Sequence, residues 1–207
     1  DPRSPAYRAN IPALCGRCHP TIAKTFEGSV HGEAVARKVE EAPVCTDCHG
    51  EHTISAASDP TSAVAPRNVA TPCASCHEEE GLADKFGLPK HRYRTYLSSY
   101  HGLVNRYGRK AGANCARCHG VHDIRPSDDP KSSIHPANLA ATCSSCHPGK
   151  VVRPDGGKVH VEGSLGSSRA AYYLHAYTAW LIGAPVLGLL IFLGIRIRGW
   201  LRKSAPQ

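Results

Sequence analysis

All ten cysteines of this 207-residue chain lie in five C-x-x-C-H pentapeptides, and no other feature constrains the fold as strongly. Two thiols at this spacing can both bond to one edge of a porphyrin, and the histidine that follows can ligate the iron. A zinc site needs four ligands and gives no reason for a histidine after each pair, and a disulfide framework would show varied spacings. We therefore expect five covalently bound c-type haems, attached through Cys15, Cys18, Cys45, Cys48, Cys73, Cys76, Cys115, Cys118, Cys143 and Cys146. The expected proximal iron ligands are His19, His49, His77, His119 and His147.

The composition agrees with a fold built around these groups. Aromatic residues make up only 6% of the chain, methionine is absent, and glycine (19) and proline (16) are frequent. Such a chain has few large side chains with which to fill a core of its own. We expect a mostly irregular chain with short α-helices wrapped around five haems, and little or no sheet.

A repeat occupies the middle of the chain. Residues 45–77 and 115–147 align without a gap at an offset of 70, with identical residues at 16 of 33 positions. The match extends upstream, so residues 28–77 correspond to residues 98–147. Equal spacing over this length indicates duplication of a two-haem module. The site at Cys15 has no counterpart at the same offset, which explains why there are five sites and not six. We expect all five sites to lie in one haem domain over residues 1–170.

The remaining histidines are candidates for the distal side of each iron. Without methionine, an iron here has either two histidine ligands or an open position, and the lack of a methionine ligand favours low potentials. His31 and His101 share the setting S-x-H-G, His52 and His122 share C-H-G-x-H, and His160 follows the last site much as His31 follows the first. The predicted distal ligands are thus His31, His52, His101, His122 and His160. Because His52 and His122 each follow a proximal histidine so closely, we expect each to reach a neighbouring haem.

Three histidines are left over: His91, His135 and His175. His175 lies just before an apolar stretch and among aromatic residues. It is a candidate to accept a quinol proton, to contact a partner, or to ligate the fifth iron in place of His160. The alternative is an ordinary histidine at a membrane interface.

The C-terminal residues predict a membrane anchor. Residues 177–195 carry no charge, and a helix of this length is enough to cross a hydrocarbon layer of about 30 Å. Tyr172, Tyr173, Tyr177 and Trp180 would lie at one interface, and Arg196, Arg198, Arg202 and Lys203 follow the other end. The positive-inside rule places this basic tail in the cytoplasm. Residues 171–207 are therefore expected to form an interfacial segment, a transmembrane helix over about 177–195 and a cytoplasmic tail, with the haem domain on the extracytoplasmic side of the cytoplasmic membrane.

The formal charge of +8 does not indicate nucleic acid binding. Each haem adds two propionates and each ferric iron returns one positive charge, so we interpret the excess of basic residues mostly as compensation for the propionates. We expect no nucleic acid partner.

Residues 13–160 resemble the multihaem cytochrome c family with doubled C-x-x-C-H modules, whose segments read much like Cys115 to His147 here. The resemblance implies bis-histidine haems in a closely spaced chain outside the cytoplasmic membrane, often beside a membrane subunit that handles quinone. The anchored tail is similar to that of quinol dehydrogenases of the NapC/NirT type, although those carry their anchor at the N-terminus.

These features favour a membrane-anchored pentahaem electron carrier of a respiratory or photosynthetic complex, rather than an enzyme. It would relay electrons between a quinone-linked or b-type membrane partner and an extracytoplasmic redox partner. The alternative is a redox enzyme, either a quinol dehydrogenase at the membrane-proximal haem or an oxyanion reductase at an open haem. A filament subunit is disfavoured by the anchor.

Overall fold

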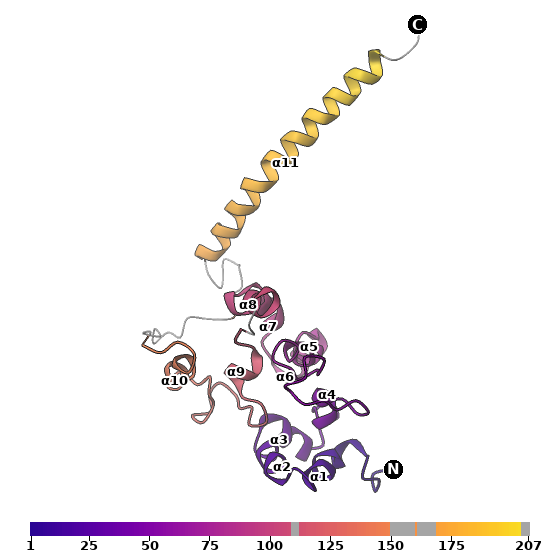
Figure 1. The fold of residues 1–207 in the computed structure, drawn as a ribbon, viewed down its shortest axis with the longest axis vertical. Coiled ribbons are helices and arrows are strands. Elements are labelled where there is room, and N and C mark those ends of the chain that lie inside the picture. Colours follow the sequence, from indigo (N-terminus) through magenta and orange to yellow (C-terminus); the bar gives the residue numbers. More distant parts are fainter. Residues whose placement is uncertain (109–111, 150–159, 161–168, 204–207) are drawn as a thin grey trace. The chain divides into compact units, whose positions relative to one another are not determined.

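The computed structural model describes residues 1–108, 112–149, 160 and 169–203. All regular structure within these ranges is helical, which confirms the prediction of short helices without sheet. The chain divides into two compact units, Asp1–His160 and Val161–Gln207. The first unit contains η1 Arg8–Asn10, α1 Ile11–Gly16, α2 Pro20–Glu27, α3 Val30–Ala36, α4 Cys45–His49, α5 Ala70–His77, α6 Glu80–Phe86, α7 Arg92–Ser98, α8 Tyr100–Tyr107, α9 Cys115–His119 and α10 Leu139–Ser144 (Figure 1). The second contains α11 Arg169–Lys203.

The α-helices of the first unit are only five to eight residues long, because turn-forming residues interrupt the chain. Gly87 ends α6 in the left-handed conformation, and Gly50 and Gly120 end α4 and α9 with φ of 81° and 84°. A β-carbon is poorly accommodated at such φ values, so glycine permits these sharp reversals. Helices this short have little stability by themselves and depend on tertiary contacts.

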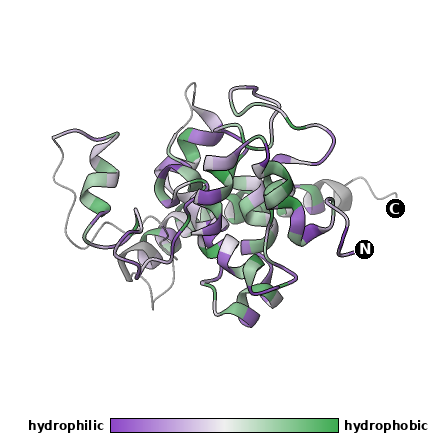
Figure 2. Cartoon of the chain, turned by 90° about the horizontal axis from the view of Figure 1, so that it is seen from below, coloured by the Kyte–Doolittle hydropathy of each residue, from purple (hydrophilic) through white to green (hydrophobic). Residues whose placement is uncertain are grey.

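Large side chains do not form the core of this unit. The buried hydrophobic residues among those described are four alanines, one valine and one tyrosine: Ala42, Val44, Ala65, Ala70, Ala83 and Tyr96. Figure 2 shows hydrophobic and hydrophilic residues mixed along the short helices rather than gathered in one layer. About 0.8 kcal/mol per buried CH₂ is the usual driving force for folding, and these residues supply little of it.

Helix α11 is long and apolar, in contrast to the short helices of the first unit. Its segment Tyr172–Gly199 is 28 residues long, apolar, and entirely unburied, so it is long and apolar enough to cross a membrane once. At 1.5 Å per residue the segment measures about 42 Å, more than the hydrocarbon core requires. It extends the predicted span of 177–195 at both ends, and Pro185 lies inside the helix. Residues 204–207 of the predicted basic tail lie outside the described residues.

Two glycines provide a matched test of these local features. Gly50→Ala forces a side chain into a backbone region that only glycine enters readily, with no atom nearer than 4.0 Å to the new β-carbon. We expect a loss of about 1–3 kcal/mol in the free energy of unfolding. Gly81→Ala lies within α6 with open space around it and should stabilise by about 0.5–1 kcal/mol. Urea unfolding, followed by far-UV circular dichroism, measures the urea concentration at half unfolding of each variant. This midpoint should fall for Gly50→Ala only, and equal midpoints for the two variants would contradict the backbone argument.

Candidate metal centres

The second and fourth C-x-x-C-H motifs share one local structure. Each forms a complete five-residue helix, α4 and α9, ended by the positive-φ glycine that follows the histidine. At the start of α4, the backbone N–H of Val44 donates to Asp47 Oδ2 over 2.6 Å. At the start of α9, the side chain of Asn114 accepts from the backbone N–H of Arg117 over 3.0 Å. The two equivalent helices therefore begin with different capping residues but present their cysteines and histidine in the same way.

The first, third and fifth motifs share a different structure. Each is preceded by the sequence D-P-x-S and then, at the same position in all three, by an asparagine. The amide nitrogen Nδ2 of Asn68 donates to the carbonyls of Pro60 and Ser62 over 2.9 and 2.8 Å. Asn138 makes the same pair of bonds to Pro130 and Ser132, and Asn10 makes it to Pro2 and Ser4, at 2.8 Å throughout. Three of the five C-x-x-C-H motifs thus follow one kind of hydrogen-bonded loop.

This third copy of the loop was missed by the sequence analysis, which compared the first motif only with the position at the offset of the central repeat. The sequence does contain a signal for this third loop, namely an aspartate at a fixed interval before the first cysteine of three motifs. These residues are Asp1, Asp59 and Asp129. In each case the carboxylate accepts a bond from the backbone N–H of the second residue after it, at 2.8–2.9 Å. The segment before the first motif therefore has the same loop structure as the segments before the third and fifth motifs.

The S-x-H-G motif positions His31 and His101 at the start of a helix. Ser29 Oγ accepts from the backbone N–H of Gly32 over 3.0 Å, and Ser99 Oγ accepts from Gly102 over 3.2 Å. A β-carbon on either glycine would collide with the end of the preceding helix, at Phe26 and Tyr96. The serine caps the helix, the glycine allows close approach, and the histidine between them is held in a fixed direction.

Four of the five histidines that end the C-x-x-C-H motifs face a second histidine ring. The ring centroids lie 6.1 Å apart for His49 and His122, 6.3 Å for His77 and His31, 6.4 Å for His119 and His160, and 6.0 Å for His147 and His101. Metal–imidazole bonds are about 2 Å long, so two imidazoles that ligate one ion from opposite sides have centroids about 6 Å apart. The spacing of all four pairs fits an iron between the rings.

Contacts outside the rings keep two of these partners in place. The backbone N–H of Val30 donates to the carbonyl of Ile124 over 2.9 Å, which holds the segment that contains His122 against the first module. Thr95 Oγ1 lies 3.0 Å from Nδ1 of His160. A ligand histidine commonly makes such a bond with one ring nitrogen while the other faces the metal.

The paired histidines lie in surroundings that favour the neutral imidazole. Burial, with a smaller contribution from His77, lowers the pKa of His31 to about 4. Burial also lowers the pKa of His77, His119, His122 and His160. Neutral imidazole is the form that ligates a metal, so these rings need not lose a proton to do so at neutral pH.

The other histidines are not brought into such pairs. Among the described residues of the first unit, His19 faces no second ring, and the side chain of His52 is 93% exposed, with Glu51 as its ionic neighbour. His91 caps α7, with φ of 60°, and Nδ1 of His135 accepts from the backbone N–H of Ala137. His175 lies exposed on α11, where its carbonyl accepts from Thr178 Oγ1 over 3.0 Å.

Successive attachment sites lie next to one another in chain order. Burial and the nearby Cys15 thiol raise the pKa of Cys45 to about 11, and burial and the nearby Cys73 raise that of Cys48 to about 11. Interaction with Cys115 raises the pKa of Cys73, and burial with the nearby Cys143 raises that of Cys118. Arg8 also joins the first and second sites, through bonds of 2.9 and 3.0 Å to Asp47. Each site therefore has the next one as a neighbour, from the first to the fifth.

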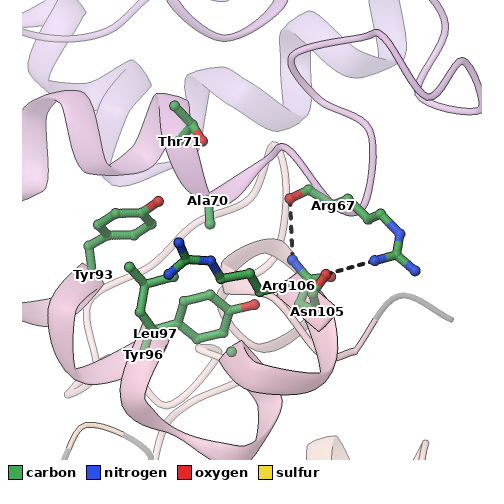
Figure 3. A pocket seen from close by; sticks show the side chains of 9 residues that line it. Arg67, Ala70, Thr71, Tyr93, Tyr96, Leu97, Asn105 and Arg106 are labelled. Carbon is green, nitrogen blue, oxygen red and sulfur yellow. Dashed lines mark hydrogen bonds between the residues drawn. The ribbon is translucent and has the colours of Figure 1, made fainter. Parts of the chain in front are cut away.

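A cavity of about 280 Å³ lies between α5, α7 and α8 (Figure 3). Two arginines line it. Arg67 is engaged, donating to the carbonyls of Asn105 and Gly108, whereas the guanidinium of Arg106 points into the space beside Tyr93 and Tyr96. Asn105 is 6% exposed, and its Oδ1 has no hydrogen-bond partner among the residues that the structure describes. The cavity adjoins the start of α5, which also carries Cys73. A porphyrin attached at Cys73 would lie near this cavity, and the two arginines that line the cavity could bind its carboxylates.

The chain has no match among protein-family models, curated proteins or solved structures. Its chemistry is inferred from its own residues, namely the five motifs, the three repeated loops and the four facing pairs of rings.

Proposed function

We propose that this chain is a pentahaem c-type cytochrome in which four irons have two histidine ligands. The chain would hold these irons between His49 and His122, His77 and His31, His119 and His160, and His147 and His101. The four ring separations, from 6.0 to 6.4 Å, are the observation that carries this proposal. The near-absence of large buried side chains supports it further, because covalently held porphyrins would supply the missing apolar volume.

The proposed activity is electron relay. When bound, each haem iron supplies one-electron redox chemistry, and ligation by two histidines without methionine favours low potential. The residues of the chain bring successive attachment sites into proximity, fix the direction of each imidazole and place cations such as Arg106 where propionates need them. Because the thiols of adjacent sites are neighbours, electrons would pass through the sites in chain order.

Helix α11 would anchor this relay in the cytoplasmic membrane. Its length and composition support a single crossing, and its basic C-terminal residues favour a cytoplasmic end with the haem domain on the periplasmic side. The proposed partners are a quinone-linked or b-type membrane subunit and a soluble extracytoplasmic redox protein. The exposed aromatic residues from Tyr172 to Trp180, with His175 among them, would contact the membrane partner.

The ligation can be tested at His122. The iron that His122 would ligate is the one attached through the motif of His49, which lies in the other copy of the repeat. His122→Ala should convert one low-spin haem to high spin, because the described structure offers no other ring to His49. His122→Met should keep that haem low-spin but raise its potential. EPR spectroscopy of the oxidised protein and a redox titration measure both effects. The control His135→Ala removes a histidine outside the pairs, and a spectrum of His122→Ala identical to that control would contradict the pairing.

The relay can be tested with the full chain in detergent. The dithionite-reduced protein is mixed in a stopped-flow instrument with an excess of an oxidised, soluble, single-haem cytochrome c. We expect five electrons to leave each chain in one kinetic phase, because transfer between neighbouring sites is faster than protein encounter. The control Cys15→Ala/Cys18→Ala should deliver four electrons in one phase. Haems that remain reduced after the acceptor stops changing would contradict a connected relay.

A further inference from the structure

Helix α8 presents three large side chains to solvent on one face. Tyr100 is 77% exposed, Leu103 47% and Tyr107 72%. Their spacing of three and four residues places them on the same side of the helix. Single exposed apolar side chains are common on protein surfaces, but a row of three along one helix is typical of a surface that another molecule covers.

The repeat supplies a comparison for this face, because α3 is the equivalent helix of the first copy. The residues of α3 at the three equivalent positions are Val30, Glu33 and Arg37. Glu33 and Arg37 are exposed and form an ion pair of 3.8 Å, and the backbone N–H of Val30 donates to the carbonyl of Ile124 in the second copy. The same kind of helix can therefore carry a charged surface, so its fold does not require the exposed apolar row of α8.

The two copies of the repeat also differ in charge. Residues 28–51 contain five acidic residues, and the second copy has a neutral or basic residue at every equivalent position. These residues of the second copy are Leu103, Lys110, Ala111, Arg117 and Val121. Both copies have two C-x-x-C-H motifs and would carry the same number of propionates, so bound haems do not cancel the difference. The copy that contains α8 is therefore the more basic one.

The helices around this face follow the same trend. Neither α7 nor α8 contains an acidic residue, and Arg94 and Arg106 are exposed on them. An acidic side chain does bond to the start of α7, that of Glu78, but its carboxylate is engaged, because it accepts from the backbone N–H of Tyr93 over 2.6 Å. A molecule that covers the apolar row therefore meets positive charge at its edge, which favours an acidic partner.

This face also lies beside a histidine that the proposed function assigns to an iron. The rings of Tyr100 and His101 meet edge to face, with centroids 6.4 Å apart, and the ring of His101 lies 6.0 Å from that of His147. Interfaces between redox proteins are small, with an apolar centre and charged residues at the rim that attract the partner. An exposed aromatic row on basic helices, next to the fifth C-x-x-C-H motif, has this composition.

We propose that this face of α8 is the docking site for an acidic extracytoplasmic redox protein. The proposal rests on the proposed pentahaem function and identifies the fifth site as the point of exchange with that partner. The partner would cover the apolar row with a small apolar surface of its own and place carboxylates near the arginines. The attraction depends on charge, so the encounter weakens as salt screens the charges.

The test uses the full chain in detergent, reduced with dithionite and mixed with an excess of an oxidised single-haem cytochrome c. Two acceptors of similar size and potential are compared, one acidic and one basic. Each transfer takes one electron from a ferrous iron of this chain to the ferric iron of the acceptor. We expect a larger second-order rate constant for the acidic acceptor at low salt, and a fall in that constant as salt is added.

The double variant Leu103→Glu/Tyr107→Arg gives α8 the two residues that α3 has and leaves the net charge unchanged. It should slow transfer to the acidic acceptor about tenfold, because it removes the apolar centre of the interface. The control Ile54→Ser replaces an exposed apolar residue in the other copy and should leave the rate constant unchanged. Ferricyanide is too small to need a docking face, so it should still take five electrons from each variant.

Equal rate constants for the two acceptors, or a double variant as fast as the Ile54→Ser control, would overturn the docking site and leave the relay intact. A loss of rate that appears only in vesicles of anionic lipid, and not in detergent, would assign this face to the lipid surface and would also overturn the proposal. A chain from which ferricyanide takes fewer than five electrons would instead contradict the pentahaem function itself.

Discussion

Pairs of imidazole rings, facing each other at the spacing that one metal ion requires, are the interaction on which the rest of this structure depends. The members of each pair are far apart in the chain, and His49 and His122 are the most widely separated. An ion between such rings closes a long loop, as a disulfide does, and thereby restricts the unfolded chain. The pairing of His49 with His122 also joins the two modules of the repeat. In the proposed protein, ligation therefore contributes both chemistry and tertiary structure.

The small core follows from this arrangement. Alanine and valine dominate the buried apolar residues described, and the helices of the first unit are too short to be stable alone. The half-buried imidazoles have lowered pKa values, because burial disfavours their charged form. Without a metal, burying these polar rings costs free energy and little apolar packing offsets it. In the proposed cytochrome, the fold is therefore expected to form together with haem attachment.

Much of this account was predictable from sequence, because covalent chemistry imposes fixed local spacings. The composition predicted short helices without strands, and the charge-free stretch predicted the long helix α11, whereas the roles of the ten cysteines and of the histidine in each motif stay predictions. The setting S-x-H-G correctly grouped His31 with His101, since each follows the serine that caps its helix. The pairing itself was not predictable. His52 and His122 have the same local sequence, yet among the described residues only His122 faces a second imidazole. That difference arises from long-range contacts such as Val30 with Ile124, which no local pattern encodes.

Anomalous diffraction at the iron edge from crystals of the haem-loaded full chain would test the central claim most directly. Five iron positions are expected. Four should lie midway between the rings of the paired histidines, including one between His49 and His122, and the fifth should lie beside His19. An iron beside His49 whose opposite ligand is not His122, or fewer than four irons between the paired rings, would contradict the account.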